Sequence, residues 1–288
     1  MKILMFGKTG QVAREILARA DDVIAFGRDE ADLSDPGACA GVVAEAAAQG
    51  AEVVINAAAY TAVDKAEEEE ALAAAINGAA PEAIARAAAS AGLPFLHVST
   101  DYVFDGAGEA PFAPDHPTAP LGAYGRTKLA GEEGVRAAGG LHAILRTSWV
   151  FSAHGGNFVK TMLRLAESRD RLTIVGDQIG GPTPAADIAE ALLTMARAFH
   201  EGRGTSGTFH FSGAPDTSWA GFAREIFAQA GKEVEVVDIP TAEYPTPAAR
   251  PLNSRLDCGS LAEAYGIARP DWRAGLKDVL AALKTEKK

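Results

Sequence analysis

Tyr124 and Lys128 are the pair of side chains with the sharpest chemical meaning in this sequence. They are four residues apart in a segment, Gly122 to Ala138, whose apolar spacing predicts a helix, so both project from one face. A lysine charge about 4 Å from a phenol, at an effective dielectric near 20, is worth ~4 kcal/mol, enough to lower a tyrosine pKa by roughly three units from ~10. We therefore expect Tyr124 to serve as a general acid near neutral pH, although the same spacing also arises by chance in many helices.

Hydroxyl side chains close a neighbouring predicted strand. Ser99 and Thr100 come at the end of the apolar run Phe95 to Ser99, and open α/β sheets place their ligands at the carboxyl ends of strands. A hydroxyl there can hydrogen-bond a substrate carbonyl and share proton delivery with Tyr124; alternatively, both residues are local caps of a turn. The small side chains from Asn56 to Thr61, after another apolar run, would lie against a flat nicotinamide or ribose.

A glycine-containing turn follows the first apolar run, Lys2 to Phe6. Gly7, Gly10 and Ala13 give the spacing GxxGxxA at the start of the predicted helix Gln11 to Ala20, which is where a phosphate-binding turn must lie. Glycine permits a tight turn and close backbone approach, and the free N–H groups at the start of a helix attract a pyrophosphate. The steric need of any strand-to-helix turn for glycine is the competing explanation.

The corner after the second apolar run, Val23 to Phe26, bears on the choice between NAD and NADP. An acidic residue at this corner binds the ribose hydroxyls of NAD and repels an added phosphate. Gly27 and Arg28 follow the run instead, and an arginine favours the 2′-phosphate of NADP. Asp29 comes next, so Arg28 can also be an ordinary surface arginine.

The elements that must position these residues alternate along the first half of the chain. The apolar runs that predict buried strands are Lys2 to Phe6, Val23 to Phe26, Val53 to Asn56, Phe95 to Ser99 and Ala143 to Thr147. The stretches between them that predict helices are Gln11 to Ala20, Pro36 to Gln49, Val63 to Ser90 and Gly122 to Ala138. This alternation predicts an α/β fold with a doubly wound parallel sheet, a Rossmann fold, as a dinucleotide-binding domain over residues 1–150.

After Ser148 the segments become shorter and the loops carry more proline and glycine, which predicts a second, smaller α/β domain for substrate over residues 151–288. Its expected helices are Phe158 to Glu167, Ala186 to Phe199, Trp219 to Ala230 and Ala274 to Lys284, with strands at Leu172 to Val175 and Thr208 to Phe211. We expect the chain to pass between the two domains near residues 177–200 and 210–235.

The composition excludes several classes of protein. The chain has 27 Lys and Arg against 38 Asp and Glu, a formal net charge of −11, which argues against a nucleic-acid partner or an anionic membrane surface. Its two cysteines, Cys39 and Cys258, form no CxxC pattern, which argues against a disulfide framework or a zinc ribbon. We recognise neither a signal peptide nor a run of about 18 apolar residues, so a cytoplasmic enzyme with a small polar substrate is expected.

Together the residues resemble the extended short-chain dehydrogenase/reductases, and within them the reductases that act on dTDP-linked 4-keto sugars. The resemblance runs over nearly the whole chain. It is carried by Phe6 to Val12; Asn56 to Ala59 with Thr61 to Glu67; Ser99 to Phe104; Tyr124-Gly125 with Thr127 to Glu132; Arg146 to Val150; Asn157-Phe158 with Lys160 to Arg164; Asp177-Gln178 with Gly180 and Pro182-Thr183; and Tyr244 to Ala248 with Arg250-Pro251 and Asn253 to Leu256.

This resemblance implies reduction of the 4-keto group of dTDP-4-dehydro-L-rhamnose to give dTDP-L-rhamnose, with NADPH as the donor and NADH as the alternative. The family's catalytic triad falls on Thr100, Tyr124 and Lys128. The implied cofactor contacts are Gly7, Gly10, Gln11, Val12, Arg28, Asp32, Leu33, Ala59, Tyr60, Thr61, Val98, Tyr124 and Lys128, of which Asp32 and Leu33 would lie near adenine. The implied contacts to the nucleotide-sugar substrate are Thr100, Asp101, Trp149, Asn157 and Arg250.

Two departures from the family pattern shape the expectations. Gly27 and Arg28 stand where some members have an acidic residue, which supports NADPH over NADH. Some bacterial members dimerise through magnesium held by glutamates, whereas here Ala185 and Ala186 follow Pro184 and the tail reads Lys284 to Lys288. We therefore expect no metal, and a monomer rather than a metal-bridged homodimer.

Two other functions stay open. A sugar-nucleotide epimerase or dehydratase shares the fold and the Tyr/Lys pair, although dehydratases of this superfamily usually carry an acidic pair beside the threonine, where this chain has Asp101 and then Tyr102. The other is a non-catalytic regulatory subunit that keeps the reductase fold. The intact Thr100, Tyr124 and Lys128 argue against this second alternative.

Overall fold

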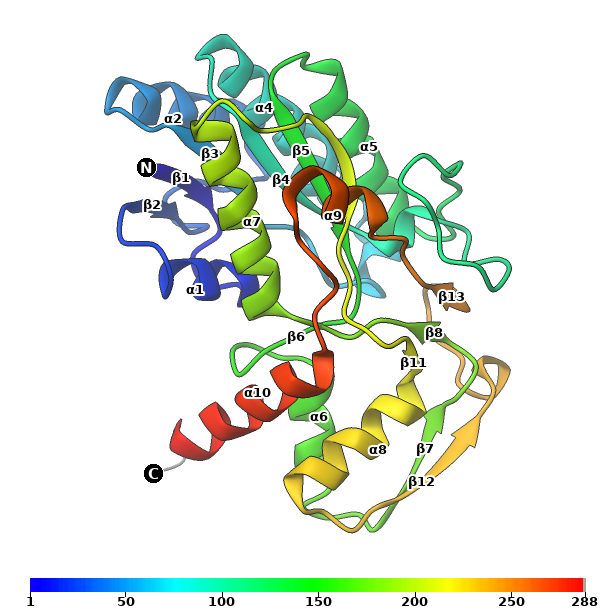
Figure 1. Ribbon diagram of the computed structural model, residues 1–288. Coiled ribbons are helices and arrows are strands. Elements are labelled where there is room, and N and C mark those ends of the chain that lie inside the picture. The colour runs from blue at the N-terminus through cyan, green and yellow to red at the C-terminus, as the bar shows by residue number, and fades with distance from the viewer. Residues whose placement is uncertain (287–288) are drawn as a thin grey trace.

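The structure is a computed structural model that describes residues 1–286. At its centre is a six-stranded sheet in which all neighbouring strands are parallel, in the order β2-β1-β3-β4-β5-β10 (Figure 1). The strands are β1 (Ile3–Phe6), β2 (Val23–Phe26), β3 (Val53–Asn56), β4 (Phe95–Thr100), β5 (His142–Thr147) and β10 (Gly207–His210). The chain moves outward from β1 to β2 and then returns to β3 on the other side of β1. The connections leaving β1 and β3 diverge, and this reversal is where open α/β sheets bind ligands.

Helices cover both faces of this sheet, as the predicted α/β fold class requires. One face carries α2 (Pro36–Ala48), α4 (Ala80–Ser90) and α5 (Ala123–Ala137), and the other carries α1 (Gln11–Leu17) and α7 (Ala185–His200). Alternate residues of β1 serve the two layers: Leu4 and Phe6 pack with the first group, and Ile3 and Met5 with the second. Burial on both faces explains why the strands read as continuous apolar runs.

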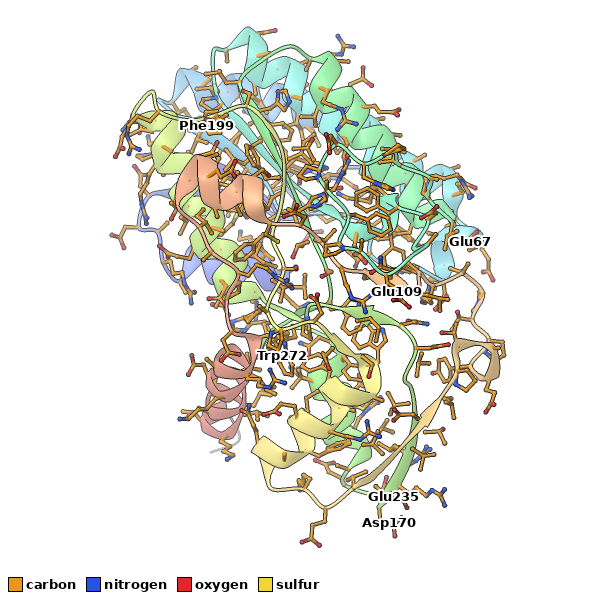
Figure 2. The ribbon with its side chains drawn as sticks, turned by 45° about the vertical axis from the view of Figure 1, so that its right-hand side comes forward. Glu67, Glu109, Asp170, Phe199, Glu235 and Trp272 are labelled. Carbon is orange, nitrogen blue, oxygen red and sulfur yellow. The ribbon has the colours of Figure 1, made fainter. Side chains whose placement is uncertain are left out.

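A smaller lobe lies at the carboxyl side of the sheet (Figure 1). It contains α6 (Phe158–Leu165), β7 (Arg171–Val175), α8 (Trp219–Ala230), β12 (Glu235–Ile239) and α10 (Trp272–Glu286), with β7 and β12 paired in parallel. Its core includes Phe222 and the fully buried Trp272, whose rings meet edge to face at 5.2 Å. Figure 2 shows Trp272 near the junction with the large sheet and Asp170 and Glu235 at the far tip.

Short elements complete the described chain. They are η1 (Lys65–Glu67), α3 (Glu70–Ala74), η2 (Ala75–Ala79), η3 (Asp101–Val103), β6 (Val150–Phe151), β8 (Ile179–Gly180), β9 (Thr183–Pro184), β11 (Thr217–Ser218), η4 (Thr241–Glu243), β13 (Asn253–Ser254) and α9 (Gly259–Tyr265). The sequence analysis contained neither β12 nor α9.

The single helix expected from Val63 to Ser90 is wrong. The segment is divided into η1, α3, the wide π turn η2 and α4. Pro81 lacks the N–H that would bond the carbonyl of Asn77, which explains a widened turn just before it. The side chain of Asn77 binds both backbone groups of Tyr60, so this interruption also fixes the loop after β3.

The second half of the chain contributes to both lobes. Helix α7 and strand β10 follow residue 150 yet pack on the large sheet, whereas α8 and α10 pack in the smaller lobe. The domain boundary between residues 150 and 151 stays a prediction. None of the helices within residues 1–286 is long and apolar enough to span a bilayer.

Candidate active site

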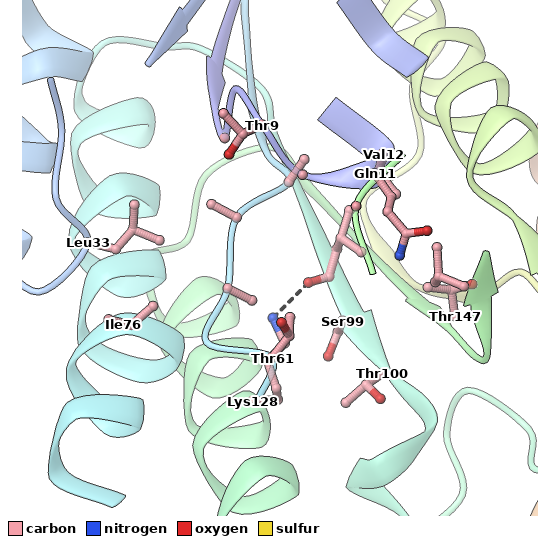
Figure 3. A pocket seen from close by; sticks show the side chains of 18 of the residues that line it. Thr9, Gln11, Val12, Leu33, Thr61, Ile76, Ser99, Thr100, Lys128 and Thr147 are labelled. Carbon is pink, nitrogen blue, oxygen red and sulfur yellow. Dashed lines mark hydrogen bonds between the residues drawn. The ribbon is translucent and has the colours of Figure 1, made fainter. Parts of the chain in front are cut away.

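A cleft of about 640 Å³ opens where the loops after β1, β3, β4 and β5 meet. Figure 3 shows Gln11 and Val12 on one side of it, Ser99 and Thr100 at the carboxyl end of β4, and Lys128 from α5 at its base. The predicted site residues that line it are Gly7, Gly10, Gln11, Val12, Arg28, Asp32, Leu33, Ala59, Thr61, Val98, Thr100, Asp101, Tyr124, Lys128 and Trp149. The structure therefore brings the predicted catalytic residues, and the predicted cofactor residues other than Tyr60, to one cavity.

The glycine turn between β1 and α1 has the geometry of a close backbone approach. Gly7 has φ +104°, and a Cβ added to it would lie 3.2 Å from the carbonyl carbon of Ala57 after β3. Gly10 precedes α1, whose first N–H groups receive no side-chain cap from it. A Cβ at Gly10 would meet only Ala57 O, at an ordinary 3.8 Å, so space remains beside this turn. Gly7 is needed by the fold, and Gly10 leaves room for a ligand.

Charges of both signs flank the corner after β2. Arg28 lines the cleft, and Lys8 from the glycine turn pairs with Glu30 at 3.2 Å. Glu30 Oε2 also accepts the backbone N–H of Gly27 at 2.9 Å, and this bond with the Lys8 charge holds the pKa of Glu30 below its usual value. Glu30 was not predicted, because a carboxylate was expected at the end of β2 and not three residues after Gly27.

Thr100, Asp101 and Tyr124 form a hydrogen-bonded chain at the other end of the cleft. Thr100 Oγ1 donates to Asp101 Oδ1 at 3.0 Å, and a hydrogen bond between the side chains of Thr100 and Tyr124 lowers the pKa of the Tyr124 phenol. Asp101 Oδ2 is buried and has no hydrogen-bond partner within residues 1–286. Burial raises the pKa of Asp101 to about 6. Hydrogen bonds from the Ser254 and Thr100 side chains offset part of this rise.

The predicted lowering of the Tyr124 pKa by Lys128 is wrong for this structure. Burial raises the pKa of Tyr124 to about 12, and its hydrogen bond to Thr100 offsets only part of that rise. The Tyr124 ring lies edge to face with that of Tyr102, at 5.5 Å between centroids. Tyr124 therefore carries its proton at neutral pH and can deliver it as an acid.

Lys128 points from α5 toward β4. Its Nζ donates to the Val98 carbonyl at 2.8 Å and lies 3.2 Å from His97 Nε2. The side chain is 1% exposed, and burial lowers its pKa to about 8. The expected proximity of Lys128 and Tyr124 on one helix holds, but the nearest polar partners of the amine are on β4.

A buried ionic network supports the same helix. Glu132, one turn after Lys128, receives Arg146 Nε at 2.8 Å, Arg146 Nη2 at 2.6 Å and the Ser99 hydroxyl at 2.6 Å. Burial alone would raise the pKa of Glu132, but Arg146 and Ser99 outweigh it and hold the pKa below the usual 4.5. Ser99 thus binds Glu132 rather than a ligand, and this network fixes α5 against β4 and β5.

Trp149 joins the cleft to the smaller lobe. Its ring stacks on Trp219 of α8 with 3.7 Å between centroids, and the Trp219 indole donates to Gln178 Oε1 at 3.1 Å. Trp149 has φ +49°, the one positive φ outside glycine in the described chain. Such backbone strain, of order 1–3 kcal/mol, is typical of functional sites. Nothing in the local sequence of Trp219 predicted this contact.

Three predicted contacts do not line the cleft. Tyr60 turns its hydroxyl to Glu69, Asn157 caps α6 and donates to Gln11 Oε1 at 3.0 Å, and Arg250 pairs with Asp64 at 2.8 Å. Asn157 is thereby connected to the cleft through Gln11, whereas Arg250 is held beside the loop after β3.

The described residues contain no group of three or more His, Cys, Asp or Glu side chains placed to hold a metal. Asp187 of α7 nevertheless lies near enough to Asp278 and Glu15 that their charges, after burial, contribute to a raised pKa for Asp187. The sequence analysis did not consider these carboxylates. Lys287 and Lys288, the last two residues of the C-terminal tail, lie outside the described residues.

The open cleft at the strand-order reversal, with a glycine turn at one end and a half-buried tyrosine at the other, is typical of nucleotide-dependent oxidoreductases with the extended short-chain dehydrogenase/reductase fold. A family model described as the RmlD substrate binding domain matches residues 1–285. The chain belongs to this family, that of the dTDP-4-dehydrorhamnose reductases.

Known relatives cover the chain from end to end. The dTDP-4-dehydrorhamnose reductase of Burkholderia thailandensis is 46% identical over 95% of this chain and 96% of its own. That of Sinorhizobium fredii is 44% identical over 100% of this chain and 99% of its own. The crystal structure of dTDP-4-dehydrorhamnose reductase from Bacillus anthracis in complex with NADP matches with a TM-score of 0.91 at 32% identity, over 98% of this chain and 100% of that one. The predicted family and fold class are confirmed.

Proposed function

We propose that this protein reduces the 4-keto group of dTDP-4-dehydro-L-rhamnose to give dTDP-L-rhamnose, with NADPH as the hydride donor. The observation that carries the proposal is that Tyr124, Thr100 and Asp101 interact in a row at one end of the cleft that begins at the glycine turn, which places a proton donor beside a buried carboxylate. Its relatives of 44% and 46% identity bear the name of this reaction.

The nucleotide end of the cleft fits a dinucleotide. The close approach of Gly7 to Ala57 leaves no room for a side chain in the turn, and the backbone beside Gly10 is open. Arg28 supplies a fixed positive charge for a 2′-phosphate, with Asp32 and Leu33 beside the adenine. The NADP bound by the Bacillus anthracis relative supports this choice of cofactor. Bound there, the nicotinamide supplies the hydride and the protein supplies position and protons.

The reaction end holds and protonates the sugar. Thr100 and Tyr124 converge on the carbonyl oxygen, and Tyr124 gives that oxygen its proton. Asp101 Oδ2 accepts a neighbouring hydroxyl of the sugar, while Trp149 supplies a flat apolar face. Such fixed groups act mainly by orientation, because each is held by packing before substrate arrives.

Contacts farther along the substrate form part of the same proposal. Arg250, paired with Asp64 beside the loop after β3, binds the diphosphate, and Asn157 acts through its hydrogen bond to Gln11. Residues 1–150 form the dinucleotide domain and 151–288 the substrate domain, with α7 and β10 returning to the sheet. We also propose a cytoplasmic protein, because its two cysteines are buried and unpaired. We propose a monomer, because Ala185 and Ala186 follow Pro184 where some family members bind magnesium, and sedimentation with magnesium or with chelator tests the oligomeric state.

A spectrophotometric assay of NADPH oxidation, with and without dTDP-4-dehydro-L-rhamnose, tests the function. We expect NADPH consumption that depends on the sugar nucleotide and yields dTDP-L-rhamnose. Conversion of a sugar nucleotide without added reductant, with tightly retained NAD, would instead establish an epimerase or dehydratase. No turnover of either kind, with nucleotide binding intact, would favour a regulatory subunit.

A further inference from the structure

Trp219, the first residue of α8, does not line the cleft but covers one face of Trp149, which does. The two indole rings are 12° from parallel, with 3.7 Å between their centroids. Both side chains are half-buried. Stacked aromatic rings stabilise each other beyond the area they bury, so the plane of Trp219 determines the plane of Trp149.

The backbone of Trp149 is fixed by hydrogen bonds that leave its ring free to turn. Its φ of +49° is rare for a bulky side chain and persists only where the surrounding structure holds it. The Trp149 carbonyl accepts the N–H of Thr183 at 3.2 Å, and the hydroxyl of Ser148 donates to the carbonyl of Gly181 at 2.9 Å. None of these bonds restrains the indole, whose orientation must therefore come from the groups packed against it.

Gly180 in β8 provides space for the indole of Trp149. A Cβ added to Gly180 would lie 3.0 Å from Trp149 Cε2 and 3.1 Å from Cζ2, closer than nearly all real Cβ contacts. Strand β8 pairs with β11, which leads directly into Trp219, and both strands lie where the two lobes meet (Figure 1). The same small sheet thus supports Trp149 at Gly180 and places Trp219 on its face.

A chain of hydrogen bonds fixes Trp219 in turn. Its indole N–H is a donor only, and it donates to Oε1 of Gln178 at 3.1 Å, which leaves the Gln178 amide nitrogen to donate to Thr241 Oγ1 at 3.1 Å. The Thr241 hydroxyl donates to Asp177 Oδ1 at 2.6 Å. Every donor in this chain has an acceptor, and Gln178 is buried, so the chain restrains the rotation of Trp219.

A purely structural role in the core of the smaller lobe is the alternative for Trp219. It does contact Phe158 at 4.7 Å and Phe222 at 6.3 Å, but those ring pairs are tilted by 54° and 36°. Trp272, the core indole of the same lobe, is 0% exposed, whereas Trp219 is half-buried. The closest and most nearly parallel ring contact of Trp219 is therefore the one with the cleft residue Trp149.

We propose that Trp219 is a positioning residue for the sugar: stacked on Trp149 and held by Gln178, it fixes the indole plane that the sugar ring meets. This rests on the proposed function, in which Trp149 supplies a flat apolar face to the sugar. A ring that is fixed before the substrate arrives loses less side-chain entropy on binding than a free one. The effect is specific to the sugar, because NADPH binds along the glycine turn and Arg28.

Circular dichroism of the full-length protein without added nucleotide tests the stack. Two indoles held face to face couple their electronic transitions and produce an exciton couplet in the far-ultraviolet spectrum. We expect this couplet in the wild type and its loss in Trp219→Phe. Trp272→Phe is the matched control, because it removes the third tryptophan, which stacks on neither of the other two, and it should keep the couplet. A couplet that survives in Trp219→Phe would overturn the proposal.

Isothermal titration calorimetry tests the effect on the sugar, by comparing dTDP-L-rhamnose with dTDP alone. In Trp219→Leu we expect Kd for dTDP-L-rhamnose to rise about three- to tenfold, with Kd for dTDP and for NADPH unchanged. Trp219→Phe should recover part of the affinity, because its ring can still stack, and Trp272→Phe should leave all three Kd values unchanged. A loss of folded protein would lower the binding stoichiometry instead. Equal rises for dTDP and dTDP-L-rhamnose, or no rise in either, would overturn the proposal.

Gln178→Met tests the hydrogen-bonded chain, because it keeps the length of the side chain but removes the acceptor of the Trp219 indole. We expect a weaker couplet and a rise of about two- to threefold in Kd for dTDP-L-rhamnose, smaller than in Trp219→Leu. An unchanged couplet and Kd would refute the role assigned to Gln178. None of these measurements needs turnover. A protein that binds dTDP-L-rhamnose but does not reduce dTDP-4-dehydro-L-rhamnose would refute the proposed function and leave the positioning role to be decided by the couplet and the Kd values.

Discussion

The two ends of the cleft keep their charged side chains in opposite surroundings. At the nucleotide end, Lys8 and Glu30 pair with half of each side chain exposed, at 50% and 47%. At the reaction end, Lys128 and Glu132 are 1% and 0% exposed. Solvent screens the attraction between Lys8 and Glu30, so this pair contributes little to stability. Lys128 and Glu132 are buried, so the residues that contact them determine their pKa values and affect the stability of the fold.

This difference matches what each end must do. A polyanionic nucleotide arrives from water, and exposed cations can bind it without being desolvated in advance. Proton delivery to a carbonyl needs acids whose pKa values are set by burial and fixed partners, as for Tyr124 at about 12 and Lys128 at about 8. Substitutions at the buried end should therefore have large effects, and those at the exposed end small ones.

Tyr124→Phe should have the largest effect. The ring and its contact with Tyr102 persist, but the proton that Tyr124 gives to the carbonyl oxygen is lost. We expect kcat to fall about 10²- to 10⁴-fold while the Kd for NADPH changes little, as measured by steady-state kinetics and fluorescence titration. Tyr265→Phe on α9, which removes a hydroxyl that donates to the Thr205 carbonyl, is the control. Near-normal turnover in Tyr124→Phe would exclude this phenol as the proton donor.

Glu132→Gln should have the next largest effect, here on folding. It leaves the buried Arg146 without a carboxylate, which typically costs about 3–5 kcal/mol of unfolding free energy. Glu70→Gln removes the exposed partner of Arg126 and should barely move the urea midpoint. Equal midpoints for both variants would contradict the contrast between buried and exposed charge.

The pKa of Glu132 also predicts how the stability of the fold changes at acid pH. The pKa of Glu132 in the folded protein is below 4.5, its value in an unfolded chain. Ionised Glu132 therefore contributes fully to the free energy of unfolding above about pH 4.5. This contribution is lost as the pH falls through the lowered pKa of Glu132 in the folded protein. Urea midpoints of the wild type should drop in that acidic window by more than those of Glu132→Gln.

The helices, the strands and the exposed nucleotide end of the cleft were easier to predict from the sequence than the contacts between buried side chains. Strand β1 was predictable because parallel strands buried on both faces read as unbroken apolar runs. The shared helix of Tyr124 and Lys128 followed from their spacing. The turn of Lys128 toward His97 did not, because the two residues are 31 apart and meet only through the packing of α5 on β4. For the same reason no local pattern paired Trp149 with Trp219.

Arg28→Ala probes the nucleotide end. An exposed cation that meets a phosphate contributes modestly, so we expect KM for NADPH to rise about three- to tenfold with kcat nearly constant and KM for NADH unchanged. Arg14→Ala, an exposed arginine on α1 outside the cleft, is the control. A matching loss with both cofactors would show that Arg28 acts on a part of the nucleotide common to NADPH and NADH.

Glu30→Gln should have the smallest effect, and it tests whether this corner of the cleft selects NADPH or NADH. Its carboxylate engages Lys8 and the Gly27 N–H at the corner where a 2′-phosphate would lie. Removing that negative charge should lower KM for NADPH about two- to fivefold and leave KM for NADH nearly unchanged, with Glu82→Gln on α4 as the control. If instead KM for NADH rises and that for NADPH does not fall, Glu30 binds ribose hydroxyls. The exposed corner would then select NADH, through a carboxylate placed three residues after Gly27 rather than at the end of β2.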